Sequence, residues 1–315
     1  MKNKKILRVG IIGLGRMGKN HLSILSTLNS VEIKFISDLN KNKYLYNDFY
    51  FSKILTTGQL KLIDAAIIST PTSTHFKIIK KIGKHVKNIF VEKPIAKNFT
   101  ETKKIIDYAK KNKLNLKVGF VERFNPAIES LFDNLKNNKQ IVSFDFIRAG
   151  PSDIKDVDVI TDLMVHDIDL SIFFNGKVKT VKSYGYKSGN KISHSIAVLT
   201  HYNGIISKFI ASRITQKKIR TMNVTLKNKY IESDLLKKEI NIFTNTKIKG
   251  LNNNLTFKSI SETIQTRHKE ALLFELQAFI NSCNGINNKF LSDFEESYEV
   301  MRICEKIKKN IRYLN

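Results

Sequence analysis

The sequence predicts a chain of two domains, an α/β domain followed by an α+β domain. With 315 residues, the chain is long enough for two domains of ordinary size. Over the first 120 residues, short apolar runs alternate with amphipathic stretches, which indicates a doubly wound parallel sheet covered on both faces. Beyond Pro126, alternating runs follow one another, which indicates a mostly antiparallel sheet with helices packed apart from it. We therefore expect domains at residues 1–121 and 122–315.

The order of elements in the first domain follows from apolar runs and helical periodicity. Five apolar runs are expected to be strands: Arg8–Ile12, Val31–Ile36, Ala65–Ser69, Ile89–Val91 and Leu116–Phe120. The amphipathic stretches between them are expected to be helices: Met17–Leu28, Ser73–Lys84 and Thr100–Asn112. Asn98 or Thr100 can cap the last of these helices.

The second domain is expected to contain one sheet and four helices. Alternation predicts strands at Ile141–Arg148, Val178–Tyr186, His194–His201, Ile205–Arg213, Arg220–Leu226 and Tyr230–Thr244. Helical periodicity predicts helices at Ala127–Leu135, Thr161–Phe174, Lys269–Asn281 and Asp293–Arg312. The segment Asn252–Ser261 has a poor strand pattern and is expected to be a loop. Because helices cover one face of such a sheet, a homodimer or homotetramer is expected to cover the other.

The net charge of +26 is dominated by lysine. Of the 54 basic residues, 9 are Arg and the other 45 are Lys. Because Arg makes the usual bidentate contacts with bases and phosphates, this surplus indicates solvated surface rather than a nucleic-acid interface. The two cysteines, Cys283 and Cys304, are too few for a disulfide framework or a metal-ligand cluster. No apolar stretch approaches the roughly 20 residues that span a bilayer, so we expect a soluble cytoplasmic protein without a metal.

A glycine-rich turn follows the first expected strand. The segment Gly13–Gly18 reads G-L-G-R-M-G, and Asp38 closes the second strand 20 residues after Gly18. Between a strand and a helix, such glycines allow a tight turn, close approach of a pyrophosphate and close packing of the helix on the strand. Asp38 can accept hydrogen bonds from both ribose hydroxyls and would repel a 2′-phosphate. The motif predicts a Rossmann domain that binds NAD rather than NADP; the alternative is a glycine turn without a ligand.

Polar residues follow three more strands at the edge where such sheets bind ligands. Ser69–His75 ends in a histidine that lies either at the site or on a helix surface. Glu92–Pro94 contains Lys93, which the following proline holds extended, although Lys93 is otherwise one of 45 lysines. Val118–Pro126 contains Arg123, a candidate for a specific anion contact. The expected cofactor-binding residues are Gly13, Gly15, Arg16, Met17, Gly18, Asp38, Ser69, Thr70, Pro71, His75, Glu92 and Lys93.

The segment Asp162–Leu170 carries the densest chemistry of the second domain. On a helix, Asp162 and His166 are four residues apart and share a face. The carboxylate can then orient the imidazole ring and stabilise its protonated form, which predicts a general acid–base pair. The alternative is a surface pair in which Asp162 only caps the helix.

Together these segments resemble the Gfo/Idh/MocA oxidoreductase family. The resemblance spans nearly the whole chain. It rests on the glycine motif followed by His21, on Glu92–Pro94, on the Asp162-x-x-x-His166 spacing and on Glu270–Phe279. It implies NAD-dependent oxidation of an alcohol, with Lys93, Asp162 and His166 as catalytic residues and a cis peptide bond before Pro94.

Within the family, the segments around Arg123 and His166 are most similar to the UDP-N-acetylglucosamine 3-dehydrogenases. This implies oxidation of the 3-hydroxyl of the sugar nucleotide to a ketone. A partner aminotransferase would use the ketone on the way to a 2,3-diamino sugar of lipid A or another surface polysaccharide. Arg123, Asn125 and His166 are then the expected substrate-binding residues, with Arg123 near the diphosphate. One departure is the short segment between Asp38 and the strand expected near Lys53–Leu55, which can alter the adenine pocket.

Three other functions remain open from the sequence. The first is a dehydrogenase of the same family that acts on another substrate, such as UDP-GlcNAc-uronate or inositol; no additional cation for a carboxylate is identified. The second is a non-catalytic NAD-binding regulator, which the joint presence of Lys93, Asp162 and His166 disfavours. The third is a nucleic-acid binder, which has charge in its favour but no recognisable reading helix or RNA-binding motif. For an enzyme, we expect the active site between the domains, with the boundary near residues 121–126.

Overall fold

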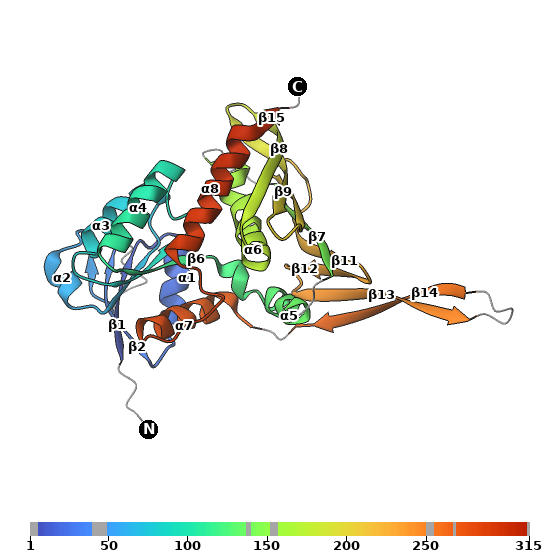
Figure 1. Cartoon of the computed structure of the whole chain (residues 1–315). Helices are drawn as coiled ribbons and strands as arrows, with labels where there is room; N and C mark the ends of the chain where they lie inside the picture. The colour runs from blue at the N-terminus through green and yellow to red at the C-terminus, as the bar shows by residue number, and fades with distance from the viewer. Residues whose placement is uncertain are drawn as a thin grey trace. The chain divides into compact units, whose positions relative to one another are not determined.

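The computed structural model describes residues 6–39, 49–136, 140–151, 157–249, 255–266 and 269–313. The chain divides into two compact units, each with its own sheet (Figure 1). The first unit is Met1–Phe124 with Glu270–Met301, and the second is Asn125–Lys269 with Arg302–Asn315. The expected boundary after residue 121 is close to the observed division after Phe124. The expectation that all of residues 122–315 form the second domain is corrected, because residues 270–301 pack in the first unit.

The first unit is built on a parallel sheet of six strands in the order β3-β2-β1-β4-β5-β6. The strands are β1 (Leu7–Ile12), β2 (Val31–Ser37), β3 (Phe51–Ser52), β4 (Ala65–Ile68), β5 (Asn88–Glu92) and β6 (Asn115–Gly119). This is the strand order of a Rossmann fold, so the predicted fold class of the first domain is confirmed. The short β3 lies just before the strand position expected near Lys53–Leu55.

Helices cover both faces of this sheet (Figure 1). Val9 and Ile11 of β1 share one buried cluster with Leu25 and with Leu276 and Phe279. The last two residues belong to the helix that returns after the second unit, and its apolar face is why residues 270–301 join the first unit. The elements are α1 (Arg16–Leu25), α2 (Thr57–Lys61), η1 (Thr72–Thr74), α3 (His75–Ile82), α4 (Phe99–Lys111), η2 (Val121–Phe124), α7 (Ala271–Cys283) and the start of α8 (Phe294–Asn310).

The second unit is built on a sheet of nine strands in the order β14-β13-β12-β11-β7-β10-β9-β8-β15. All neighbours are antiparallel except β7 with β10 and β8 with β15, which confirms the predicted mostly antiparallel sheet. The strands are β7 (Ile141–Ala149), β8 (Val178–Ser188), β9 (Lys191–His201), β10 (Ile206–Ser212), β11 (Ile219–Leu226), β12 (Lys229–Asp234), β13 (Glu239–Lys249), β14 (Leu255–Gln265) and β15 (Ile311–Tyr313).

Two expectations for this sheet need correction. The single strand expected at Tyr230–Thr244 is two strands, β12 and β13, separated by a turn in which Lys238 has φ 60°. The loop expected at Asn252–Ser261 is wrong from Leu255 onward, where β14 pairs with β13; residues 252–254 lie outside the described residues. Because β14 is an edge strand, its residues 259–263 are exposed, and its sequence lacks the apolar alternation of a strand packed on a core.

The second unit also contains two helices, α5 (Pro126–Leu135) and α6 (Val165–Asn175). Helix α5 comes before β7 along the chain, and α6 lies between β7 and β8. Helix α6 packs on β7, where Phe174 lies 5.6 Å from Phe144 between ring centroids and Asp167 pairs with Arg148 at 2.8 Å. The helix expected at Thr161–Phe174 is not uniform. It opens with a π-helical turn, η3 (Ile160–Met164), and becomes α-helical only at α6.

Candidate active site

Three glycines shape the turn between β1 and α1. Gly13 has φ 94°, and a Cβ atom there would lie 2.7 Å from the backbone of Ser69 and Thr70. A Cβ atom on Gly18 would overlap the carbonyl oxygen of Gly13. Gly15 is exposed, and a Cβ atom there would meet nothing within 4 Å. The protein's own packing therefore requires Gly13 and Gly18, whereas Gly15 leaves open space in front of α1.

The start of α1 presents backbone donors to this space. Gly15 is the N-cap residue; no side chain caps the helix, and no acid lies in its first turn. First-turn N–H groups have no acceptor within their own helix and favour anions. Arg16 is exposed and Met17 is half-buried at the same end. Beside the turn, the Oδ2 atom of Asp38 accepts a hydrogen bond from the Leu14 N–H at 2.6 Å. The donors, the space and the carboxylate fit the pyrophosphate and a ribose of NAD.

The turn after β4 packs directly on the glycine turn. The Ser69 hydroxyl donates a hydrogen bond to the Gly13 carbonyl oxygen at 2.8 Å. The Thr74 hydroxyl donates to the Thr70 hydroxyl at 2.8 Å, and exposed Pro71 precedes η1. Ser69–Pro71 thus lies at the carboxyl end of β4, next to the turn with the open space.

His75 is buried, which corrects the alternative that it lies on a helix surface. It is 1% exposed, and both ring nitrogens lie near backbone carbonyl groups. Its Nε2 atom lies 2.9 Å from the Thr70 carbonyl oxygen, and its Nδ1 atom lies 3.3 Å from the Ile95 carbonyl oxygen. Burial lowers the pKa of His75, and the two carbonyl contacts oppose that shift. His75 therefore ties the turn after β4 to the segment that follows Pro94.

Glu92, at the end of β5, has a partner on α1. Its Oε1 atom lies 2.7 Å from Nε2 of His21, whose side chain is fully buried. His21 completes the glycine motif in the sequence, but no role was predicted for it. The contact links the helix that starts at the glycine turn to the residue that precedes Lys93.

Lys93 follows β5 and is half-buried. The peptide bond from Lys93 to Pro94 is cis, as the family resemblance implied. The segment is anchored on both sides, by the contact of Glu92 with His21 before it and by the contact of Ile95 with His75 after it. Lys93 therefore occupies a fixed position at the carboxyl edge of the parallel sheet.

The side chains of Arg123 and Asn125 contact other residues of the chain. Arg123 is fully buried in η2, and its Nη1 atom pairs with Glu296 Oε2 at 3.1 Å. Asn125 is 7% exposed; its Oδ1 atom accepts from the Ala127 N–H and its Nδ2 atom donates to the Leu235 carbonyl oxygen. The geometry does not support the expectation that these two side chains hold a substrate.

Asp162 and His166 lie on consecutive helical segments of the second unit. Asp162 belongs to η3, and half-buried His166 is the second residue of α6. The Oδ2 atom of Asp162 accepts a hydrogen bond from Arg213 Nη2 at 2.7 Å. Sequence reasoning missed Arg213. The signals that could have found it are the scarcity of arginine and its position where a predicted strand ends.

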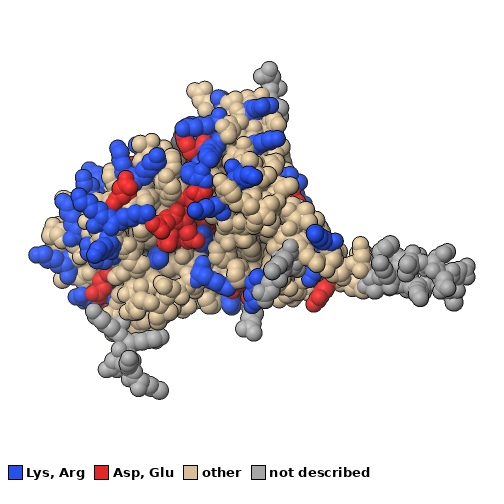
Figure 2. Space-filling model, in the orientation of Figure 1, with Lys and Arg blue, Asp and Glu red and all other residues tan. Residues whose placement is uncertain are grey.

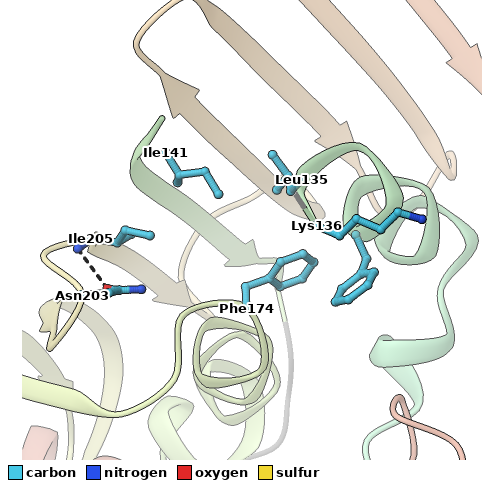
Figure 3. Close-up of a pocket in the computed structure, with 7 residues that line it drawn as sticks. Leu135, Lys136, Ile141, Phe174, Asn203 and Ile205 are labelled. Carbon is cyan, nitrogen blue, oxygen red and sulfur yellow. Dashed lines mark hydrogen bonds between the residues drawn. The ribbon is translucent and has the colours of Figure 1, made fainter. Parts of the chain in front are cut away.

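A cavity of about 390 Å³ in the second unit lacks the chemistry of a redox site. Figure 3 shows mostly apolar side chains around it, with Asn203 Oδ1 accepting from the Ile205 N–H at 3.1 Å. Phe174 lies near the end of α6, eight residues and about 12 Å along the helix axis from His166. None of the predicted site residues lines it. The lining residues are Phe132, Leu135, Lys136, Ile141, Phe174, Asn203 and Ile205.

Figure 2 shows Lys and Arg spread over many elements of the visible face, with Asp and Glu between them, rather than gathered in one basic patch. Among the described residues, no group of His, Cys, Asp and Glu side chains could hold a metal ion. None of the described helices is long and apolar enough to cross a membrane.

The Rossmann order, the open glycine turn and the carboxylate beside it are those of a dinucleotide-binding domain. Residues 7–120 match the Gfo/Idh/MocA family model, described as "Oxidoreductase family, NAD-binding Rossmann fold". The chain thus carries the NAD-binding domain of the Gfo/Idh/MocA oxidoreductases, and NAD is its cofactor.

Named relatives cover most of the chain. The chain is 25% identical over 296 residues to UDP-N-acetylglucosamine 3-dehydrogenase of Acidithiobacillus ferrooxidans, covering 89% of this chain and 92% of that protein. A crystal form of that enzyme has a TM-score of 0.85 at 23% identity, with 97% of each chain covered. Myo-inositol 2-dehydrogenase of Thermotoga maritima is 24% identical, covering 66% of this chain and 69% of that protein. An Agrobacterium radiobacter oxidoreductase in complex with NAD⁺ has a TM-score of 0.80 at 15% identity, with 97% and 96% covered.

Proposed function

We propose that this chain oxidises a hydroxyl of a sugar nucleotide to a ketone, and that the substrate is UDP-N-acetylglucosamine oxidised at its 3-hydroxyl. The observation that carries this proposal is the extent of the likeness. The sugar-nucleotide dehydrogenase aligns with 89% of the chain, including the second unit, whereas the myo-inositol enzyme aligns with 66%. Because function depends on the residues of the site rather than on the fold, likeness that extends beyond the cofactor domain is informative.

In the proposed reaction, His166 takes the proton of the substrate hydroxyl as a general base. The Lys93 ammonium donates a hydrogen bond to the same oxygen and stabilises the negative charge that develops on it. NAD, when bound, supplies the hydride acceptor. The Asp162 carboxylate lies four residues before His166, and a carboxylate near the ring would favour the protonated imidazole formed during the reaction.

The anchoring of Lys93 supports its part in this reaction. A hydrogen bond stabilises a transition state best when its donor is already in place, because no reorganisation is then needed during the reaction. Contacts of both sequence neighbours, Glu92 and Ile95, fix the segment that contains Lys93. By comparison, most of the other lysines in the described part of the chain are exposed.

The test is a screen for NADH formation with a panel of UDP-sugars and free polyols, followed by NADH absorbance. An aminotransferase that accepts 3-keto sugar nucleotides is added to draw the equilibrium toward product. Turnover of UDP-N-acetylglucosamine that rises with the aminotransferase supports the proposal and a place before a transamination, as in the synthesis of 2,3-diamino sugars of lipid A or other surface polysaccharides. Turnover of free polyols alone refutes it.

A polyol dehydrogenase is the second candidate. The observation in its favour is the set of inositol dehydrogenases among the relatives, which align with 66%, 57% and 58% of this chain. The internal pairing of Arg123 with Glu296 is consistent with it, because that arginine is then not needed for a diphosphate. The same screen separates the two candidates.

We also propose that the chain forms a homodimer or homotetramer through the sheet face opposite α6. On that face, Tyr184, Ile196, Ile210 and Ile147 lie side by side across four neighbouring strands, in register. The next residue, Arg148, points to the opposite face, where it pairs with Asp167 on α6. Ile210→Asp is expected to reduce the molar mass measured by light scattering; a wild-type monomer at micromolar concentration would count against the proposal.

A further inference from the structure

Arg213 is a buried cation that touches one of the proposed catalytic residues. Its side chain is 7% exposed and lies just after β10. Nη2 donates to Asp162 Oδ2 at 2.7 Å, and Nη1 donates to the Val157 carbonyl oxygen. The Arg213 N–H donates to the Ser193 carbonyl oxygen at 2.9 Å, which fixes the backbone that carries the side chain. The Arg213 guanidinium thus links Val157, which precedes η3, to Asp162, which lies within η3.

We propose that Arg213 is a positioning residue, which holds the Asp162 carboxylate and the turn in front of His166 in their working arrangement. This inference rests on the proposed oxidation and adds a residue to it. The Asp162 side chain is 26% exposed, so water screens part of its charge and the contact acts mainly by orienting the carboxylate. Arg213 does this through a buried planar group whose donors have fixed directions.

A second ion pair, Asp158 with Lys308, also holds the η3 turn. The Oδ1 atom of Asp158 accepts hydrogen bonds from the N–H groups of Ile160 and Thr161 at 2.9 Å, and its Oδ2 atom pairs with Lys308 Nζ at 2.7 Å. Burial acts to raise the pKa of Asp158, but the Lys308 ammonium and the Thr161 hydrogen bonds outweigh it and lower the pKa. Asp158 therefore stays ionised and caps the turn.

The ion pairs Arg213–Asp162 and Lys308–Asp158 hold different parts of this turn. Asp158 and Lys308 hold the beginning of η3 without touching a proposed catalytic group. Arg213 contacts Asp162 itself, so its loss acts on the charge and orientation of the acid four residues before His166. π-helical turns are rare and frequently occur at functional sites. Arg213 contacts this one at its central residue, Asp162.

The first experiment compares Arg213→Gln and Arg213→Lys with Arg8→Gln as control. Arg8 pairs with Asp64 at 2.8 Å in the first unit, so the control also removes an Arg–Asp pair. Arg213→Gln is expected to lower kcat by about 10- to 100-fold, with the NADH dissociation constant changed by less than about twofold. Arg213→Lys recovers part of the rate, because an ammonium can still contact the carboxylate. A folded Arg213→Gln enzyme with wild-type kcat overturns the proposal.

The second experiment adds Asp162→Asn. If Arg213 acts through Asp162, Arg213→Gln causes no further loss of kcat in the Asp162→Asn background. A further loss as large as in the wild-type background shows that Arg213 acts elsewhere and overturns the proposal. Melting curves of the same variants show which of them are folded, and Arg213→Lys serves if Arg213→Gln does not fold.

A spectroscopic readout keeps this test independent of the substrate assignment. In protein labelled with ¹⁵N-histidine and bound to NADH, Arg213→Gln is expected to shift the ring signals of His166, identified with His166→Gln. Arg8→Gln is expected to leave them in place. Unchanged His166 signals in the Arg213→Gln protein refute the positioning role. If the wild-type enzyme turns over no sugar nucleotide, the proposed function fails while this measurement still decides the role of Arg213.

Discussion

Replacing Gly15 by alanine is expected to separate cofactor binding from folding. The added methyl group meets no protein atom within 4 Å, and φ at this residue, −63°, suits alanine. The only structural loss is a weaker N-cap, about 0.5–1 kcal/mol, which lowers the melting temperature by roughly 1–4 °C. The methyl group occupies the space proposed for the pyrophosphate. Losing one hydrogen bond to a charged phosphate costs about 1.5–3 kcal/mol, which weakens NADH binding about 10- to 100-fold.

Two further glycine variants complete this experiment. NADH binding is measured by fluorescence titration and stability by thermal unfolding followed by circular dichroism. Gly58→Ala in α2 is the matched control, because its Cβ atom would meet only the Thr56 hydroxyl at 3.9 Å. Gly18→Ala is expected to lose stability as well as binding, because its Cβ atom would overlap the Gly13 carbonyl oxygen. If Gly15→Ala binds NADH as tightly as the wild type, the pyrophosphate does not lie at this turn.

Three more predictions concern the cofactor, the chemistry and the pH dependence of stability. Asp38→Ala is expected to reduce the preference for NAD over NADP about tenfold or more, measured as kcat/KM with each cofactor, since it removes the proposed ribose acceptor. His166→Ala and Lys93→Ala are each expected to lower kcat by about 10²–10⁴-fold while NADH binding persists; unchanged kcat in either variant removes that residue from its role. Burial lowers the folded-state pKa of His75 and His201, so below about pH 6.5 the unfolded chain binds more protons than the folded chain. The free energy of unfolding is therefore expected to decrease as the pH falls below about 6.5, which urea unfolding at several pH values can measure.

The parts of the fold and site that the sequence predicts are those fixed by local pattern. The glycine turn is one such part, because the tasks of Gly13 and Gly18 depend on backbone geometry within one strand–turn–helix unit. The strands of both sheets follow from apolar runs or alternation. Where the pattern is weak, as in the exposed edge strand β14, the prediction is wrong.

The contacts that position the site join residues far apart in the sequence. His21 and Glu92 are 71 residues apart, and Asp162 and Arg213 are 51 apart. No periodicity links such pairs, so the sequence does not reveal them. The misplacement of residues 270–301 has the same cause, because a helix pattern shows that α7 has an apolar face but not which sheet the face covers. The scarcity of arginine marked Arg123 in the sequence but did not reveal its pairing with Glu296, which is 173 residues away.

The proposed oxidation is tested most directly by following the hydride. The enzyme is incubated with NAD and UDP-N-acetylglucosamine carrying deuterium at C3, and the NADH formed is examined by mass spectrometry. We expect NADH with one deuterium from the wild-type enzyme and little NADH from His166→Ala or Lys93→Ala. NADH without deuterium, or no NADH from this substrate while a free polyol is oxidised, contradicts the proposed oxidation at the 3-hydroxyl.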